Sequence, residues 1–125
     1  MCASSNACHG AADWEARAQL LRAIAHPVRL QILDALCHGP LCVNDVNALV
    51  TIPQPQLSQH MTALRKAGMV ACHTNGPLRC YYVSKPTFVG KLIHLCEEEH
   101  PIIEKDRATV VREAARRKGH NVPPA

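Results

Sequence analysis

The sequence predicts a mainly helical fold with one β-hairpin, with its elements in the order ααααββα. Hydrophobic residues make up 47% of the 125 residues but aromatic residues only 3%, so Leu, Ile, Val, Ala and Met must build the core, which suits packed helices. Apolar residues recur at helical spacing up to Gly68. The period then changes in MVACHTNGPLRCYYVS, where Asn75-Gly76 is a strong hairpin signal. This length suits one domain with a sizeable core.

The first two predicted helices run from Asp13 to Ala25 and from Pro27 to Cys37. Asp13 is a good N-cap residue. His26-Pro27 separates the helices, because the residue before proline disfavours helical geometry while proline suits a first helical turn. Gly39-Pro40 ends the second helix. The apolar faces are Trp14, Ala18, Leu21 and Ala25 in the first helix, and Val28, Ile32, Leu33 and Leu36 in the second.

Two shorter helices follow, Val43–Val50 and Pro55–Gly68, on either side of the turn TIPQP. Gly68 suits the C-terminal cap of the second. A long last helix spans Pro86–Arg117, and Pro101 predicts a kink or break near His100. The residues expected to face inward are Val43, Val46, Leu49 and Val50 in one short helix, and Leu57, Met61 and Leu64 in the other.

The two ends of the chain predict its organisation and location. Residues 1–12 and 118–125 are expected to be flexible tails around one domain over 13–117. The N-terminus lacks a signal-peptide pattern and no apolar run is long enough for a membrane span, so we expect a cytoplasmic protein. Seven cysteines in a reducing compartment favour metal or redox chemistry over a disulfide framework, although several could be small buried residues.

Two short helices joined by a tight turn and followed by a hairpin describe a winged helix-turn-helix, which reads DNA with its second short helix. The net charge of +4 suits an anionic partner. No acidic residue occurs between Ile52 and Ser84, whereas a face that is merely solvated usually mixes both signs. The alternative is a polar helix face without a ligand. The predicted DNA-contacting residues are Gln54 in the turn before the second short helix, Gln56, Ser58, Gln59, Thr62, Arg65 and Lys66 within that helix, and Asn75 and Arg79 in the hairpin.

Four segments in order, IAHPVRLQILDAL, LCVNDV, QPQLSQHMTALRKAGMV and GPLRCYYV, resemble the ArsR/SmtB family of metal-sensing bacterial repressors. The resemblance covers Trp14 to Glu99. It implies a homodimer packed through its first and last helices, bound to an imperfect inverted repeat in operator DNA. It also implies release by a soft metal or metalloid that switches on a resistance or efflux operon. Ser58 and His60 match the family's SxH positions; Ser58 would contact DNA, while His60 would face DNA or pack against the preceding helix.

Cys42 is the principal candidate for sensing. Arsenic and cadmium members of the family open this short helix with CVC and an acidic residue, whereas this chain has CVND, so Asn44 replaces the second cysteine. Cys42 stands where the helix needs an N-cap, and forgoes about 1 kcal/mol of capping. In exchange, the helix N-terminus would stabilise a thiolate, the form that binds metal or reacts.

Further donors must complete such a site, because As(III) and Sb(III) want three sulfurs and Zn or Cd usually four donors. Cys37 could fold back toward Cys42 across Gly39-Pro40. Cys2 and Cys8, with His9 as a further donor, could reach in from the N-terminal tail, and the alternative is an inert tail. The remaining cysteines rank lower. Cys96 is expected in the core of the last helix, and Cys72 and Cys80 pair across the hairpin with a three-residue loop but point to opposite faces with a two-residue loop.

Zinc and cobalt members of the family use carboxylate and His ligands along the last helix, and this chain departs from that pattern. Phe88 and Glu99 stand where two of those His ligands are expected. His94 and His100 are out of register and expected at the surface. REAARRK is expected to be a solvated face, with weak DNA contact as its alternative.

The sequence therefore predicts a transcriptional repressor with no permanent cofactor, released by As(III) or Sb(III) ahead of Cd(II), Pb(II) or Zn(II). A redox or persulfide sensor of the same fold is the alternative, with Cys37, Cys42 and Cys96 as its thiols. A small thiol enzyme is not expected, because LCHGPLCVND has no Arg for an anion loop and Pro40 removes a backbone donor.

Overall fold

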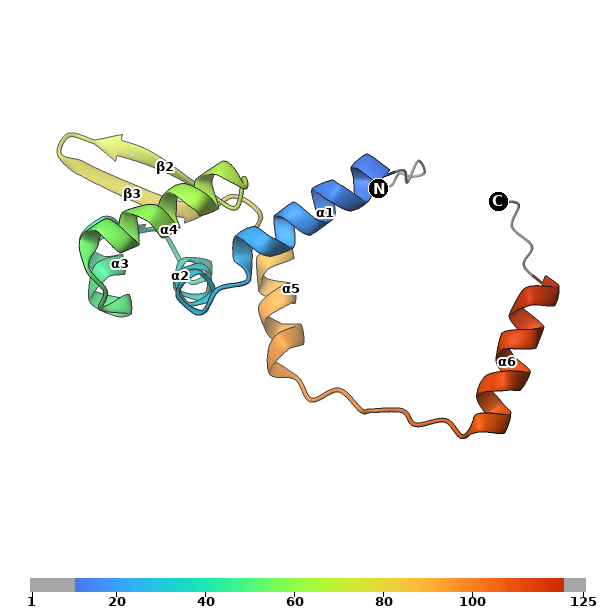
Figure 1. The fold of residues 1–125 in the computed structure, drawn as a ribbon. Coiled ribbons are helices and arrows are strands. Elements are labelled where there is room, and N and C mark those ends of the chain that lie inside the picture. The colour runs from blue at the N-terminus through green and yellow to red at the C-terminus, as the bar shows by residue number, and fades with distance from the viewer. Residues whose placement is uncertain (1–10, 121–125) are drawn as a thin grey trace.

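The computed structural model describes residues 11–120 and orders them as a helical body with a three-stranded sheet (Figure 1). The predicted tails over 1–12 and 118–125, and the domain limits between them, stay predictions. The elements are α1 (Ala11–Ile24), α2 (Pro27–Cys37), β1 (Leu41–Cys42), α3 (Val43–Val50), α4 (Gln54–Lys66), β2 (Val70–Asn75), β3 (Leu78–Val83), α5 (Pro86–Glu97) and α6 (Arg107–His120).

Helix α1 contacts the body through its C-terminal end only. Ile24 is buried and Leu20 packs against the core, whereas Trp14 and Leu21 are 63% and 52% exposed. The apolar face predicted for the first helix is therefore not buried within a single chain. Asp13 is also not the N-cap, because the helix already begins at Ala11.

Helix α2 has the predicted bounds and forms the centre of the body. The Nδ1 atom of His26 accepts a hydrogen bond from the backbone N–H of Val28 over 3.0 Å, and this N-cap starts the helix with Pro27 in its first turn. Ile32, Leu33 and Leu36 are buried as predicted. Their burial against α3, α4, α5 and β3 makes α2 the scaffold for the helix pair that follows.

Helices α3 and α4 form the predicted helix-turn-helix. Their inward residues Val46, Val50, Leu57, Met61 and Leu64 are buried, but Leu49 is exposed, contrary to prediction. The turn between them places Thr51 in the left-handed region, with φ of 32°. Gly68 follows α4 with φ of +78°, as a C-terminal cap glycine requires.

The hairpin belongs to an antiparallel sheet with strand order β1-β3-β2. The sequence missed β1, which has only two residues. The hairpin loop is Gly76-Pro77, one residue further along than the predicted turn, because Asn75 pairs with Leu78. Gly76 supplies the positive φ, 64°, that primed hairpin turns require at this first loop position. With this two-residue loop, Cys72 and Cys80 lie on opposite faces, as expected for that case.

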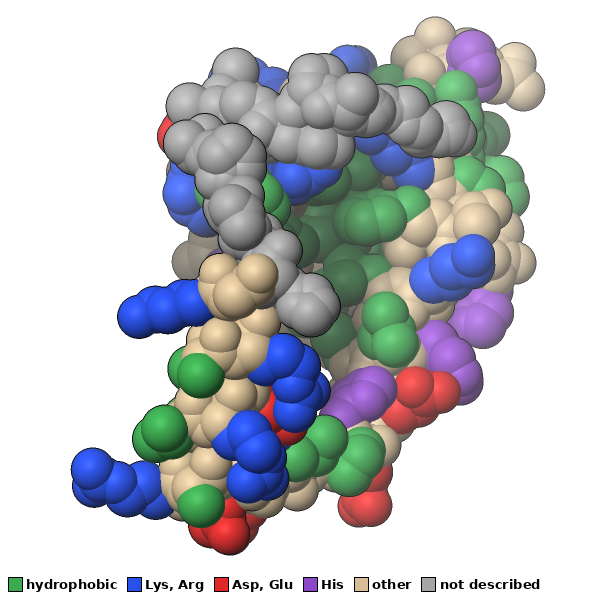
Figure 2. All heavy atoms as spheres, turned by 90° about the vertical axis from the view of Figure 1, so that its right-hand side faces the viewer, with side chains coloured by type: hydrophobic (Ala, Val, Ile, Leu, Met, Phe, Trp, Pro, Cys, Tyr) green, Lys and Arg blue, Asp and Glu red, His purple; other side chains and the backbone are tan. Residues whose placement is uncertain are grey.

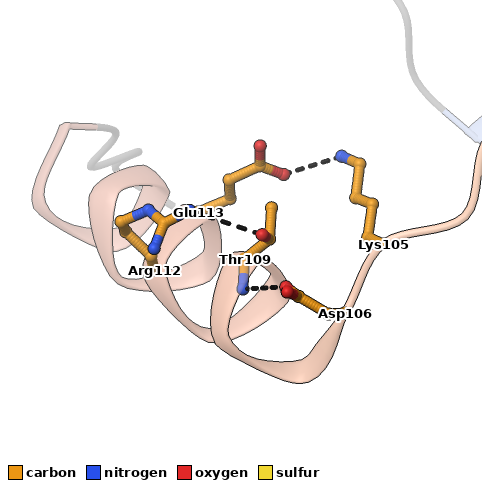
Figure 3. Close-up of polar contacts among 5 residues, drawn as sticks. All are labelled: Lys105, Asp106, Thr109, Arg112 and Glu113. Carbon is orange, nitrogen blue, oxygen red and sulfur yellow. Dashed lines mark hydrogen bonds and ion pairs between the residues drawn. The ribbon is translucent and has the colours of Figure 1, made fainter.

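The predicted last helix is broken into two. Helix α5 ends at Glu97 and α6 begins at Arg107, so the break predicted near His100 is confirmed but extends over residues 98–106. Asp106 starts α6, because its carboxylate accepts a 2.8 Å hydrogen bond from the backbone N–H of Thr109 (Figure 3). Hydrogen bonds with the side chain and then with the backbone N–H of Thr109 lower the pKa of Asp106. Lys105 also pairs with Glu113 at 2.6 Å. Within the part of the chain that the structure describes, no helix is long and apolar enough to cross a membrane.

Candidate nucleic-acid interface

Helix α4 presents an exposed polar face that has no acidic residue. Its buried residues anchor one side of the helix, so the other side is turned to solvent. Glutamine, serine and threonine offer donors and acceptors to base edges, while Arg and Lys suit phosphates or guanine. The exposed residues are the predicted set Gln54, Gln56, Ser58, Gln59, Thr62, Arg65 and Lys66.

The wing extends this surface with Arg79. A hydrogen bond with the side chain of Tyr81 holds the Arg79 guanidinium and raises its pKa. Arg79 also lines a small cavity of about 50 Å³ between α4 and β3, together with Thr62 and Arg65. The wing cation predicted at the hairpin tip therefore lies beside the recognition helix. Asn75 is exposed at the end of β2.

His60 lies on the inward side of α4. Its Nδ1 atom accepts a 3.1 Å hydrogen bond from Nε of Arg29, and its ring centroid is 4.4 Å from that of His26. Both partners belong to the start of α2. His60 therefore packs against the start of α2, and its predicted DNA contact stays a prediction.

Cys42 is the N-cap residue of α3, as predicted, but its side chain caps no backbone N–H. Its Sγ atom instead donates a 3.1 Å hydrogen bond to Oδ2 of Asp45. Because a thiolate cannot donate this bond, the contact belongs to the protonated thiol. Asp45 is the acidic residue of the CVND segment, so a metal ion at Cys42 would meet its carboxylate nearby.

Within the described part of the chain, Cys42 does not belong to a ready group of three metal ligands. Cys37 is exposed at the end of α2, where desolvation and then the Asp34 carboxylate raise the pKa of its thiol. Cys2, Cys8 and His9 lie outside the described residues. Among residues 11–120, no three His, Cys, Asp or Glu side chains form a group that could hold a metal ion.

The last predicted helix offers no alternative site. Cys96 is exposed, so its expected place in the core is wrong. His94 and His100 are exposed, as expected. Each has a local partner: His94 pairs with Glu98 at 3.0 Å, and the ring of His100 lies 2.6 Å from the carbonyl oxygen of Leu95.

The sequence ranks Cys80 below Cys37 and Cys42 as a candidate ligand. Strand β1 pairs with β3 so that Cys42 and Cys80 are directly opposite each other. No pattern in the sequence indicates this pairing, because β1 has only two residues and β3 lies far along the chain.

Comparison with known proteins agrees with the fold and the exposed recognition helix. A sequence model of the "Bacterial regulatory protein, arsR family" matches residues 26–71. The chain is 34% identical over 86 residues to the uncharacterised HTH-type transcriptional regulator MJ1325 of Methanocaldococcus jannaschii, a match that covers 68% of this chain and 96% of that protein. It is 39% identical over 62 residues to the HTH-type transcriptional repressor SmtB of Mycobacterium tuberculosis, covering 50% of this chain and 46% of SmtB.

The fold is also that of solved regulators. The transcriptional repressor BigR of Xylella fastidiosa superimposes with a TM-score of 0.58 at 29% identity, over 72% of this chain and 99% of BigR. The fold and the polar recognition helix thus define a winged-helix, DNA-binding transcriptional regulator and not an enzyme. The chain belongs to the arsR family of bacterial regulatory proteins.

Proposed function

We propose that the protein is a homodimeric repressor that binds an imperfect inverted repeat in operator DNA and is released by a thiophilic metal or metalloid. The observation that carries the DNA-binding part is the acid-free face of α4, joined by Arg79 from the wing. Cations here would neutralise phosphates, and the neutral polar side chains would read base edges. The names of SmtB and BigR support repression as the outcome.

The exposed apolar side chains of α1 and α5 support a dimer. Trp14 and Leu21 on α1 and Leu95 on α5 are more than half exposed, and the N-terminal part of α1 extends away from the body in Figure 1. Figure 2 shows hydrophobic side chains lining the recess between α6 and the body. A second copy would bury these surfaces, and two recognition helices would then address the two halves of an inverted repeat.

Cys42 supports a thiophilic inducer, with As(III) or Sb(III) ahead of Cd(II), Pb(II) or Zn(II), and a resistance or efflux operon as the target. Cys42 is the residue immediately before α3, so a ligand bound to it would act on the first helix of the DNA-reading pair. Redox or persulfide sensing is the second candidate. The exposure of Cys37 and Cys96 favours it, because accessible thiols are the ones that oxidants reach.

An operator-release assay tests both parts. The DNA would be selected by the protein from a randomised pool, and binding would be measured with arsenite, antimonite, cadmium or polysulfide. We expect arsenite to release the wild type and to leave Cys42→Ser bound, with Cys96→Ser as the matched control that still responds. If the protein stays on the DNA with arsenite but is released by polysulfide, redox sensing replaces metalloid sensing as the proposed function.

A further inference from the structure

The register of the sheet sets two cysteines from distant parts of the chain opposite each other. Cys42 ends β1 and pairs with Cys80 of β3, while Leu41 pairs with Tyr81. Side chains alternate along a strand, and Tyr81 and Val83 are buried in the core. Cys80 and Cys42 therefore share the face turned away from the core, where both are partly accessible.

The pattern of backbone bonding indicates that this pair is a close one. Asn75 and Leu78 close the two-residue loop, and the closing pair of such a hairpin exchanges backbone hydrogen bonds. Alternation then directs the backbone groups of Cys80 to β2 and those of Tyr81 to β1. Cys42 and Cys80 form a non-hydrogen-bonded pair, for which the Cα atoms are about 4.5 Å apart. One atom can bridge two sulfurs at that separation, which lies at the short end of the range that disulfides span.

The pair offers two sulfurs, and the nearby carboxylate oxygen of Asp45 is a hard ligand that soft ions disfavour. His73 pairs with Cys80 on the other side of β3, but its ring stacks on Tyr82 with centroids 5.7 Å apart. Cys72 lies on the opposite face of the sheet. Among the described residues, no three potential donors come together, so the ligand that fits is one that needs two thiols.

We propose that Cys42 and Cys80 form a dithiol site for trivalent arsenicals. This inference names the partner of Cys42 and so rests in part on the proposed function. Arsenous acid would exchange two As–O bonds for two As–S bonds, giving a dithiolate that keeps one hydroxide, As(OH)₃ + 2 RSH → (RS)₂AsOH + 2 H₂O. The two thiol protons leave in the two waters, and no electron is transferred.

Closure of the site would act on the DNA-reading surface. The bridge would join the N-terminus of α3 to β3, and it would displace the hydrogen bond from Cys42 to Asp45. On the other face of β3, next to Cys80 in the chain, Arg79 and Tyr81 line the small cavity shared with Thr62 and Arg65 of α4. A shift of β3 therefore moves the wing cation relative to the recognition helix.

The test uses phenylarsine oxide, whose arsenic offers two positions to thiols. In the full chain with the other five of its seven cysteines replaced by serine, we expect one phenylarsine per chain in native mass spectrometry, both thiols protected from alkylation, and retention against excess glutathione. Adding Cys80→Ser should leave an adduct on one thiol. The glutathione concentration that removes this adduct should be at least tenfold lower, because the chelate is lost. Equal retention without Cys80 would overturn the inference.

A second measurement serves if the serine-substituted chain does not fold. In the wild type, phenylarsine oxide should protect Cys42 and Cys80 from iodoacetamide ahead of Cys37, Cys72 and Cys96, as read by peptide mass spectrometry. Protection of Cys42 with any other cysteine refutes the pair. These readouts involve no DNA, so a wild type that binds phenylarsine oxide at this pair but keeps its operator refutes the proposed function alone.

Discussion

Nε of Arg29 donates a 3.1 Å hydrogen bond to Nδ1 of His60, which ties the start of α2 to the recognition helix α4. Nη1 of Arg29 also donates to the carbonyl oxygen of Ala23 over 2.8 Å, so the end of α1 joins the same network. His60 must be neutral to accept this bond. Desolvation, then the charges of His26 and Arg29, lower the pKa of His60.

The protein should therefore become less stable as the pH is lowered below the ordinary pKa range of histidine. The unfolded chain binds a proton at His60 near pH 6.5, whereas the folded protein does so only at lower pH. The contribution of neutral His60 is present above pH 6.5 and is lost as the pH falls toward its lowered pKa. We expect His60→Gln to reduce the difference in unfolding free energy between pH 7.5 and 5.5, measured with urea at one protein concentration.

The exposed His94 provides the control for that experiment. His94→Gln replaces an exposed histidine whose partner is Glu98 at the surface, so the pH dependence assigned to His60 should survive this change. The same pH slope in His60→Gln and in the wild type would contradict the role of the Arg29–His60 bond.

Thr51 carries backbone strain in the turn between α3 and α4. Its φ of 32° is in the left-handed region, which is costly for a β-branched residue and accessible to glycine. Thr51→Gly should raise the unfolding free energy by about 0.5–1 kcal/mol, since the strain relieved exceeds the entropy lost by glycine. Thermal and urea unfolding would measure it.

Ala48 is the matched control in the adjacent helix. It is exposed within α3, and Ala48→Gly should lower the unfolding free energy by about 0.5–1 kcal/mol. If Thr51→Gly destabilises the protein to the same degree, the conformation of the turn is not strained.

Much of the fold was predictable because the chain is punctuated by residues with strong local effects. His26-Pro27 and Gly39-Pro40 set the bounds of α2, and these bounds are correct. Strand β1 could not be predicted, because two residues have no periodicity and its partner β3 lies far along the chain. For His60 the sequence left a DNA-facing and an inward position open, because the contact that holds the ring depends on Arg29, a residue of another helix.

The faces of α1 show a different limit of sequence reasoning. Its apolar stripe predicts burial, yet Trp14 and Leu21 are exposed in a single chain. Apolar periodicity predicts that a helix face is buried. It does not say whether that face packs against the same chain or against a second copy. For the site, the sequence selected the exposed residues of α4 and the N-cap Cys42, whereas the pairing of Cys42 with Cys80 arises only from the tertiary fold.

A charge placed on α1 should break the proposed dimer. Leu21 is 52% exposed on α1, and Leu78 is 50% exposed at the wing, so the two leucines match in type and exposure. Leu21→Glu should convert the dimer to a monomer in analytical ultracentrifugation, because burying an unpaired carboxylate in an apolar interface is costly. Leu78→Glu should remain dimeric. A dimer in both variants would place the interface elsewhere.

Arg65 should contribute one phosphate contact to operator binding. It is exposed in the last turn of α4 and lines the cavity beside Arg79, where a DNA backbone between helix and wing would meet both cations. Arg65→Ala should weaken binding similarly across DNA sequences and reduce the slope of log K against log salt by about 1. Lys91→Ala removes an exposed cation on α5 and should leave the slope unchanged.

Arg65→Lys separates a phosphate contact from base recognition, because lysine keeps a phosphate contact but loses bidentate recognition of guanine. A wild-type slope in Arg65→Ala, measured by fluorescence anisotropy over several salt concentrations, would remove Arg65 from the interface.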